Sequence, residues 1–242
     1  MNQGNDVKHI FQEFSRSFQQ KITTDFYISL EYDIVGESET TIVQIQVKDG
    51  KIQLFYDTEI SVEDTLVMSY ATLKKLYTHE LTMMTAMSCL SKESGYTKRF
   101  IEPKYIDETR ILYLNKKNAE EAVSFAHRLH IMDEFFNIEN FHFAKVDSML
   151  CGKAHGVNVI GLYSDFEKGI KHAYFEINQG EVLREPPIPF SLYVLQGKGI
   201  IFTDNKKIEI EEKTYYHIEP SGEVQITSND SVVLQLLYLG RG

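Results

Sequence analysis

Three absences narrow the kinds of protein that this 242-residue chain can be. No apolar run approaches the roughly 18 to 20 residues that a membrane-spanning helix needs, so membrane insertion is not expected. No block of lysines and arginines occurs and the formal net charge is −10, so nucleic acid, whose phosphates require clustered cations, is not an expected partner. The amino terminus has neither the basic start nor the apolar core of a signal peptide, so we expect a cytoplasmic protein.

Cysteine is scarce as well. Cys89 and Cys151 are the only two, and neither lies in a C-x-x-C motif or a nucleophile signature. One such distant pair is a poor disulfide framework, so we expect both to be reduced, buried residues. The motifs G-x-S-x-G, G-x-G-x-x-G and the P-loop are absent too, so the sequence names no reaction by motif.

What is present is typical of a soluble globular protein, with 43% hydrophobic and 25% charged residues and enough length for two modest domains. In the first half, apolar residues recur at helical spacing from Val7 to Ile22, which predicts an amphipathic helix. Apolar and polar residues then alternate from Phe26 to Ile34, which predicts a half-buried strand.

A β-hairpin is predicted around Asp49-Gly50, because a type I′ turn needs two residues that accept positive φ. If Lys48 faces Lys51, the apolar pairs all fall on one face: Val47 with Ile52, Ile45 with Leu54 and Val43 with Tyr56. The opposite face then carries Gln44, Gln46 and Gln53. Turn and pattern agree on one register.

Two short helices should follow the hairpin, with Ser69 capping Tyr70 to Tyr77 and Thr82 capping Met83 to Leu90. The first half resembles the sterol-carrier-protein-2 domain in three segments: V-Q-I-Q-V-K-D-G-K-I-Q-L, E-D-T-L-V-M-S-Y-A-T-L-K-K-L and L-T-M-M-T-A-M-S-C-L. The resemblance covers about residues 5 to 96. The chain departs from the family at His79-Glu80, where a glycine is usual, and in its ending.

The resemblance implies an α+β domain with helices packed on an antiparallel sheet, and an apolar ligand held between them. Adaptable methionine thioethers suit such a lining. The candidate ligand-binding residues are Phe55, Leu76, Met83, Met84, Met87 and Leu90. The alternative is that the methionines pack an ordinary core.

A helix is predicted to begin at Asn118, where Asn118 and Glu121 form a capping box, and to connect the two halves. Its His127, His130 and Glu134 have a spacing that can converge on a metal. The alternative is a solvated polar face, which we favour because no third histidine or cysteine lies near them.

From Val157 onward, short strands and turn residues dominate, which predicts a sandwich or barrel; the nearly apolar segment 232–239 should be its central strand. The segments S-L-Y-V-L-Q-G-K-G-I-I-F, K-K-I-E-I and Y-Y-H-I-E-P-S-G resemble the cupin family over about residues 150 to 240. Metal-binding cupins carry H-x-H and Glu ahead of the first segment, and His three residues after P-x-G. Here the window Leu183–Phe190 has no histidine, and Gln225 replaces the later one.

We therefore expect a cupin barrel without metal or other cofactor. A metal-dependent dioxygenase is not expected, although the sequence does not exclude it, because His155 and His172 could still be ligands. The catalytic candidates for a metal-independent isomerase or epimerase are Glu185, Tyr193 and His217, if they point into one cavity.

The sequence thus predicts a sterol-carrier-like domain (residues 1–117), a helical connector (118–145) and a cupin-like β-barrel (146–242). The leading expectation is a non-catalytic binding protein for a hydrophobic small molecule of lipid, acyl or isoprenoid type. The barrel would serve assembly or bind a second ligand, and the cupin resemblance implies a homodimer. The enzyme in the barrel is the alternative.

Overall fold

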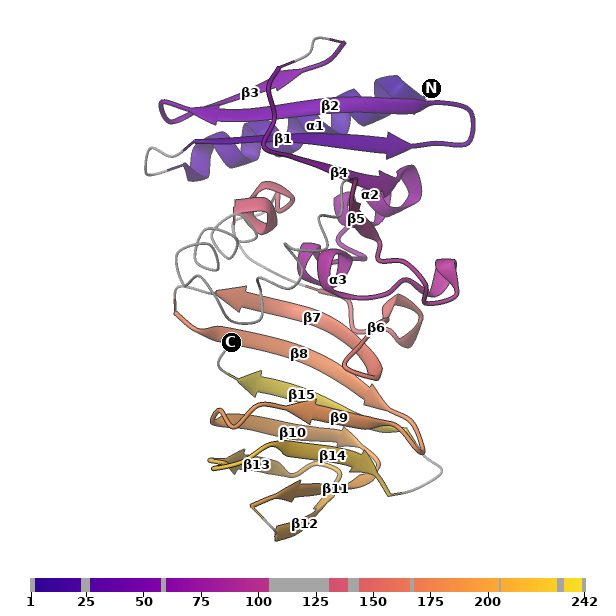
Figure 1. Cartoon of the computed structure of the whole chain (residues 1–242), viewed down its shortest axis with the longest axis vertical. Helices are drawn as coiled ribbons and strands as arrows, with labels where there is room; N and C mark the ends of the chain where they lie inside the picture. Colours follow the sequence, from indigo (N-terminus) through magenta and orange to yellow (C-terminus); the bar gives the residue numbers. More distant parts are fainter. Residues whose placement is uncertain are drawn as a thin grey trace. The chain divides into compact units, whose positions relative to one another are not determined.

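The computed structural model describes residues 3–22, 27–57, 60–104, 131–138, 144–165, 168–204, 206–229 and 233–240. The chain forms two compact units, one of Met1–Met83 with Phe100–Phe143 and one of Met84–Arg99 with Ala144–Gly242 (Figure 1). Each has its own sheet structure and its own core. The sequence-based division assigned residues 84–99 to the first domain, whereas here they belong to the second unit. The helical connector predicted over residues 118–145, with its capping box at Asn118 and Glu121, lies mostly outside the described residues.

The first unit contains one five-stranded sheet in the order β3-β2-β1-β4-β5. Its strands are β1 (Ile28–Val35), β2 (Thr40–Lys48), β3 (Lys51–Phe55), β4 (Asp64–Ser69) and β5 (Ile101–Pro103). The β1–β4 pair is parallel and the other pairs are antiparallel, so the sheet is mixed where an antiparallel one was expected. The connection from β3 to β4 crosses β2 and β1 (Figure 1).

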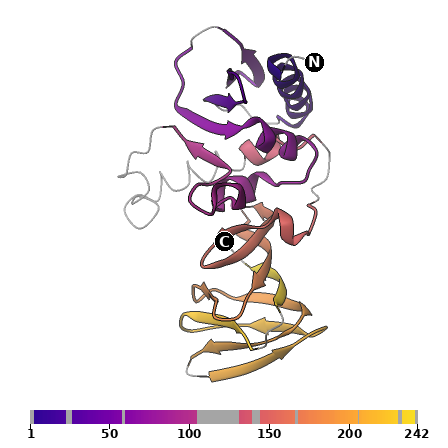
Figure 2. The ribbon, with the colours of Figure 1, turned by 90° about the vertical axis from the view of Figure 1, so that its right-hand side faces the viewer.

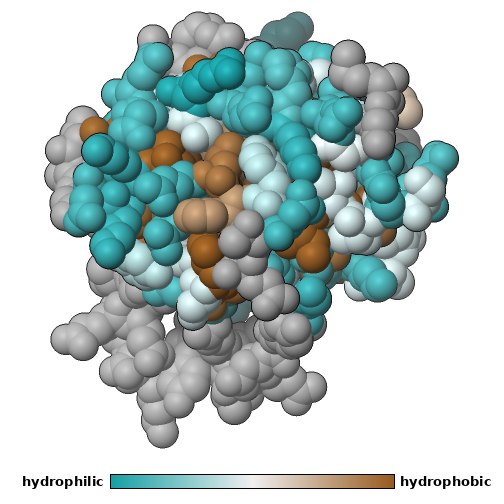
Figure 3. Space-filling model, turned by 90° about the horizontal axis from the view of Figure 1, so that it is seen from above, coloured by the Kyte–Doolittle hydropathy of each residue, from teal (hydrophilic) through white to brown (hydrophobic). Residues whose placement is uncertain are grey.

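Helix α1 (Gln3–Lys21) confirms the first predicted helix and covers one face of this sheet (Figure 2). Its buried stripe consists of Val7, Ile10, Phe11, Phe14 and Phe18. The phenylalanines meet the aromatic residues of segment 131–138 and of β1. The ring centroids are 5.0 Å apart for Phe14 and Phe136 and 5.6 Å apart for Phe11 and Tyr32. On the face of this unit seen from above, hydrophilic residues predominate and hydrophobic ones show between them (Figure 3).

The predicted hairpin is confirmed in its register and its turn. Lys48 pairs with Lys51, and the pairing continues to Gln44 and Phe55. Asp49 and Gly50 have φ of 53° and 67°, as a type I′ turn requires. Gln44 is only 4% exposed, however, although it points away from α1. The chain that crosses the sheet on that side buries it.

Helix α2 (Tyr70–Tyr77) matches its predicted bounds, and the Ser69 hydroxyl accepts a hydrogen bond of 3.0 Å from the backbone N–H of Thr72. Two phenols tie α2 to α1, because Tyr70 donates to Asp6 and Tyr77 donates to Glu13. Helix α3 (Met83–Ser88) follows; it begins at the predicted residue but ends two residues before the predicted Leu90. No helix in the described ranges is long and apolar enough to span a membrane.

The second unit contains two β-sheets. The six-stranded sheet has the order β13-β10-β15-β8-β7-β6, and the four-stranded sheet has the order β12-β11-β14-β9. The strands are β6 (Gly152–Ala154), β7 (Val157–Asp165), β8 (Ile170–Ile177), β9 (Val182–Glu185), β10 (Phe190–Gln196), β11 (Lys198–Thr203), β12 (Lys206–Glu211), β13 (Tyr215–Ile218), β14 (Val224–Ser228) and β15 (Leu234–Gly240). Two 3₁₀ turns, η1 (Lys92–Ser94) and η2 (Ser148–Leu150), complete it.

The inward residues of both sheets form one buried apolar cluster, which includes Phe175, Leu183, Leu192, Ile226 and Leu236. β15 lies between β8 and β10, so the predicted central strand is confirmed. Two antiparallel sheets that enclose one core in this connectivity form a β-sandwich of the jelly-roll kind that cupins have. This part of the chain therefore has a cupin-like fold.

Within the second unit, the segment 84–99 contacts the sandwich strands β6 and β7 through its backbone and through α3. Leu90 and Lys153 exchange two backbone hydrogen bonds of 2.9 Å each. The buried Thr85 hydroxyl accepts a hydrogen bond of 2.8 Å from the N–H of Gly161, where β7 has a bulge. A Cβ at Gly161 would lie 2.7 Å from Cγ of Met84. This close packing explains why α3 belongs to the sandwich rather than to the first sheet.

Candidate functional site in the cupin-like sandwich

Three polar residues lie inside the sandwich, at one end of its apolar core. Glu185 ends β9 two residues after the buried Leu183, so the two side chains share the inward face of the strand. Glu185 is 4% exposed. Lys171 on β8 and Tyr238 on β15 point inward with the same alternation. We call Lys171, Glu185 and Tyr238 the interior polar site.

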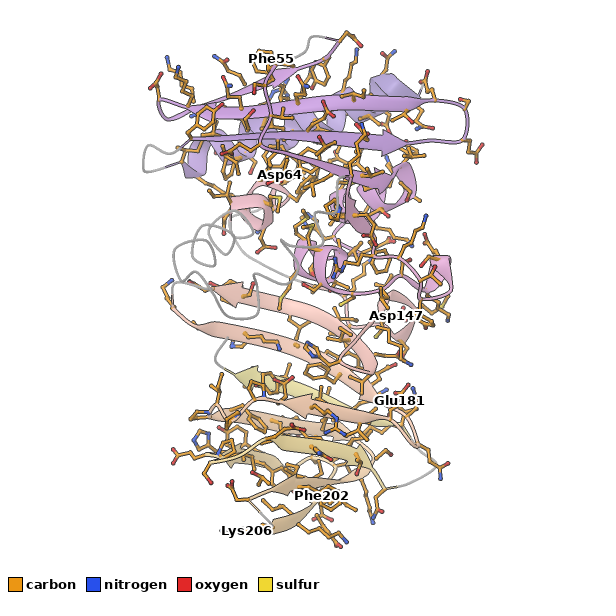
Figure 4. All side chains as sticks on the ribbon, viewed as in Figure 1. Phe55, Asp64, Asp147, Glu181, Phe202 and Lys206 are labelled. Atoms are coloured by element: carbon orange, nitrogen blue, oxygen red, sulfur yellow. The ribbon has the colours of Figure 1, made fainter. Side chains whose placement is uncertain are left out.

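The turn before β9 is fixed by Glu181, which is labelled in Figure 4. Lys153 donates to its Oε1 at 2.8 Å, and the backbone N–H of Asn178 donates to its Oε2 at 3.0 Å. These bonds hold the start of β9, four residues ahead of Glu185. The position of the buried carboxylate therefore depends on a local, hydrogen-bonded turn.

The carboxylate of Glu185 is only half satisfied. The Tyr238 hydroxyl donates to Oε2 at 3.4 Å, and the Lys171 ammonium lies 3.8 Å from Oε1. Within the described residues, Oε1 has no hydrogen-bond partner. A buried carboxylate oxygen in this state costs free energy, and a bound hydrogen-bond donor removes that cost.

The ring of Tyr238 is held from two sides. It stacks on Phe190 with centroids 5.2 Å apart, and the Lys171 ammonium lies 5.6 Å from its centroid. Burial, and then the nearby Glu185 carboxylate, raise the pKa of the Tyr238 phenol well above its ordinary value. The phenol therefore stays protonated at neutral pH and acts as a donor.

The other two catalytic candidates lie elsewhere. Tyr193 and His217 point out of the six-stranded sheet, on the face away from the core. Nδ1 of His217 lies 2.9 Å from the Ser191 hydroxyl, and its Nε2 lies 3.4 Å from an oxygen of Glu219, but the ring is exposed. The structure thus brings Glu185 together with Lys171 and Tyr238, which the sequence pattern did not select.

The positions that the sequence analysis considered as metal ligands do not come together either. His172 lies on the outer face against the Tyr163 ring, His155 lies in a turn, and Gln225 points outward from β14. Among the described residues, no group of three His, Cys, Asp or Glu side chains is arranged to hold a metal ion. His127 and His130 lie outside the described residues, and Glu134 pairs with Lys21 at 3.6 Å.

Both cysteines are free and buried, as predicted. Burial raises the pKa of the Cys89 thiol and of the Cys151 thiol to about 12. Both thiols are therefore protonated near neutral pH.

The six candidate ligand-binding residues are divided between the units. Phe55 ends the edge strand β3 (Figure 4), and the buried Leu76 lies on α2. Met83 is the last residue of its segment of the first unit, whereas Met84, Met87 and Leu90 belong to the second.

The apolar interior of the first unit is nearly filled. The hollow between α1, the sheet and segment 131–135 has a volume of about 10 Å³, which is space for about one water molecule. Its lining is wholly apolar and consists of Phe18, Ile28, Leu30, Tyr32, Ile45, Val47, Ile131, Met132 and Phe135.

Comparison with known proteins gives structural likenesses to cupins. No family model and no curated protein matches the sequence. The cupin domain of Schizosaccharomyces pombe Cnp3 is 15% identical with a TM-score of 0.32, over 35% of this chain and 60% of that domain's chain. A protein described as a predicted oxalate decarboxylase from Thermotoga maritima is 15% identical with a TM-score of 0.32, over 35% and 79%. A cupin superfamily protein from Desulfitobacterium hafniense is 15% identical with a TM-score of 0.33, over 42% and 95%.

The matched part of this chain therefore spans less than two thirds of the S. pombe structure. All three TM-scores are too low to carry an activity or a ligand to this chain. The class that the strand connectivity defines is a cupin-like β-sandwich joined to an α+β unit.

Proposed function

We propose that the cupin-like unit binds a small polar organic molecule at Lys171, Glu185 and Tyr238. The observation that supports this most is the buried Oε1 of Glu185, which has no hydrogen-bond partner among the described residues. The ligand would supply a hydroxyl or amino donor to Oε1 and an acceptor to the Lys171 ammonium. A hydroxy acid or a sugar has both kinds of group.

The same residues fit the metal-independent isomerase or epimerase expected as an alternative from the sequence. A carboxylate that removes a proton and a phenol that donates one are the two groups that such a reaction needs. Glu185 would be the base and Tyr238 the acid. Tyr193 and His217 have no part in this proposal, because they point away from the core.

The test is a thermal-shift screen of the full chain against hydroxy acids, sugars and amino acids, followed by calorimetry on any molecule that stabilises it. Binding should be lost in Glu185→Gln and in Lys171→Met. It should persist in Glu209→Gln, which removes a carboxylate that is 76% exposed on β12. Equal binding by Glu185→Gln and the wild-type chain would refute the proposal. A proton-exchange assay on the same variants separates turnover from binding.

The second proposal is the hydrophobic ligand expected from the sterol-carrier resemblance, bound between α1 and the sheet of the first unit. Nine apolar side chains surround the small hollow there, which favours an apolar molecule over a polar one. Because the hollow has space for about one water, a lipid would have to displace segment 131–138. Organic extraction of the purified protein followed by mass spectrometry tests this, with Leu30→Trp as the variant that should lose any lipid found.

A homodimer also remains a proposal. The outer face of the six-stranded sheet carries a cross-strand row of Tyr215, Tyr193 and Leu237, with Leu195 41% exposed beside it. A second copy that covered this row would bury apolar area, which is the driving force of most subunit association.

A further inference from the structure

Lys171 is a member of the interior polar site that solvent reaches. Its side chain is 24% exposed, whereas that of Glu185 is 4% exposed. It lies near the start of β8, on the same inward face as the core residues Ala173 and Phe175. A small molecule can therefore reach the end of this side chain from solvent. A primary amine in such a place is a nucleophile as well as a hydrogen-bond donor.

The oxygen of Glu185 that faces Lys171 is the one without a hydrogen-bond partner. The Tyr238 hydroxyl donates to Oε2 at 3.4 Å, and Nζ of Lys171 lies 3.8 Å from Oε1, which is too long for a hydrogen bond. Among the described residues, Oε1 has no other partner. A carboxylate oxygen in this position is placed to take a proton from the ammonium and to return it later.

A second buried ion pair of the same unit shows what a purely structural pair looks like. Nζ of Lys153 lies 2.8 Å from Oε1 of Glu181, within hydrogen-bond distance. The other oxygen of Glu181 accepts from the backbone and the side chain of Asn178, each at 3.0 Å. Both oxygens of that carboxylate are used, so the pair fixes a turn. The pair of Lys171 and Glu185 has no such closed set of hydrogen bonds.

We propose that Lys171 is a nucleophile that forms an imine with a small 2-hydroxyaldehyde, a class that includes the open-chain form of a sugar. This step rests on the ligand site proposed above and adds a covalent bond to it. Before the reaction, the carbonyl oxygen of the aldehyde accepts from the Lys171 ammonium, and the 2-hydroxyl donates to Oε1 of Glu185.

The atoms and charges of the step balance without a further reactant. Glu185 takes one proton from the Lys171 ammonium, and the Nζ lone pair forms a bond to the carbonyl carbon while the carbon–oxygen π bond breaks. A second proton moves from nitrogen to oxygen, which gives a carbinolamine. Glu185 returns its proton to the carbinolamine hydroxyl, the carbon–oxygen bond breaks, and water leaves as the carbon–nitrogen double bond forms. The product is a protonated imine of Lys171.

The test is reductive trapping of the full chain with glyceraldehyde and sodium cyanoborohydride, followed by peptide mapping with mass spectrometry. Lys153 and Lys168 are the controls within the same molecule, with side chains 34% and 71% exposed. Lys171 should be modified about tenfold or more faster than either, since a positioned acid–base group accelerates proton transfer by about 10² to 10⁴. Modification that follows exposure, with Lys168 ahead of Lys171, would overturn the proposal.

Glu185→Gln should lower the rate at Lys171 by about tenfold or more, whereas Glu209→Gln, which changes a carboxylate that is 76% exposed, should not change it. If Glu185→Gln fails to fold, propanal keeps the test decisive in the wild-type chain. Propanal lacks the 2-hydroxyl, so the ratio of Lys171 to Lys168 modification should fall relative to glyceraldehyde. An unchanged rate in Glu185→Gln, or an unchanged ratio with propanal, would contradict the proposed step.

The same variants separate this step from the ligand site on which it rests. Calorimetric binding that is lost in Glu185→Gln, together with modification that follows exposure, would overturn the imine and leave the ligand site standing. Binding that is equal in Glu185→Gln and the wild-type chain would refute the ligand site itself.

Discussion

Gly240 leaves the space that the phenol of Tyr238 occupies. A Cβ at Gly240 would lie 2.4 Å from the Tyr238 hydroxyl oxygen and 2.3 Å from Cε1 of the same ring. The two residues lie on the same side of β15, and Gly240 pairs with Phe190 on one side and with Lys171 on the other. The glycine therefore borders the interior polar site and leaves room for its phenol.

Gly240→Ala should displace the phenol from Glu185. Overpacking of this kind costs about 1 to 3 kcal/mol of unfolding free energy, which urea unfolding measures. Gly222→Ala is the matched control, because the nearest atom to its Cβ would be 3.4 Å away, at the Asp204 carboxylate. If Gly240→Ala were as stable as the wild-type chain and bound the same ligands, the phenol would not need this space.

Thr85→Val should destabilise the sandwich unit. The Gly161 N–H would lose its hydrogen bond of 2.8 Å to the Thr85 hydroxyl and stay buried, which costs about 1 to 3 kcal/mol. Thr97→Val is the control, because its hydroxyl is on an exposed turn.

A fragment of residues 144–242 should fail to fold, since it lacks α3 and the residue that pairs with Lys153. A well-dispersed NMR spectrum of that fragment would contradict this.

The stability of the first unit should decrease in acid, partly through Asp6. The hydrogen bond from Tyr70 lowers the pKa of this carboxyl below its ordinary value, with a further contribution from Lys74. A lowered pKa in the folded state stabilises the fold at pH values above the unfolded pKa, and that contribution is lost as the pH falls through the folded pKa. In Tyr70→Phe the decrease between pH 6 and pH 3, followed by chemical unfolding, should be smaller. An unchanged acid profile would refute the assignment.

Leu237→Glu should convert a homodimer to a monomer, if the row of Tyr215, Tyr193 and Leu237 is the interface. Light scattering after size-exclusion chromatography measures the mass. Phe202→Glu is the matched control, because Phe202 is 41% exposed on the outer face of the other sheet. A wild-type chain that is monomeric at all concentrations, or dimers in both variants, would contradict the proposed interface.

The fold was most predictable where local sequence chemistry and hydrophobic period agree. The hairpin at Asp49-Gly50 and the Ser69 cap were predictable because a turn or a cap depends on a few adjacent residues. β9 was not predicted, because Arg184 and Glu185 interrupt its apolar pattern and prolines follow. The parallel β1–β4 pairing was not predictable either, since periodicity gives no information about strand direction.

The candidate site was predictable only in part. Glu185 was selected from its place in the cupin pattern, but Lys171, Tyr238 and Gly240 come from strands that pair far apart in the sequence. Tyr193 was selected with them although its side chain points to the other face, because one residue of register reverses a side chain in a strand. The assignment of α3 to the sandwich depends on the bulge at Gly161, which the sequence of α3 does not indicate.

The most direct test of the interior polar site is the stability of the double variant Lys171→Met/Glu185→Leu, measured by urea unfolding together with ligand binding. Replacing both partners of a buried ion pair by apolar residues of similar volume is often neutral or stabilises the fold by about 1 to 4 kcal/mol, whereas removing one partner leaves an uncompensated charge. We predict a double variant at least as stable as the wild type that binds none of the ligands found in the screen. A double variant that loses about 3 kcal/mol or more, or one that still binds those ligands, would contradict the central claim that Glu185 is there to contact a ligand.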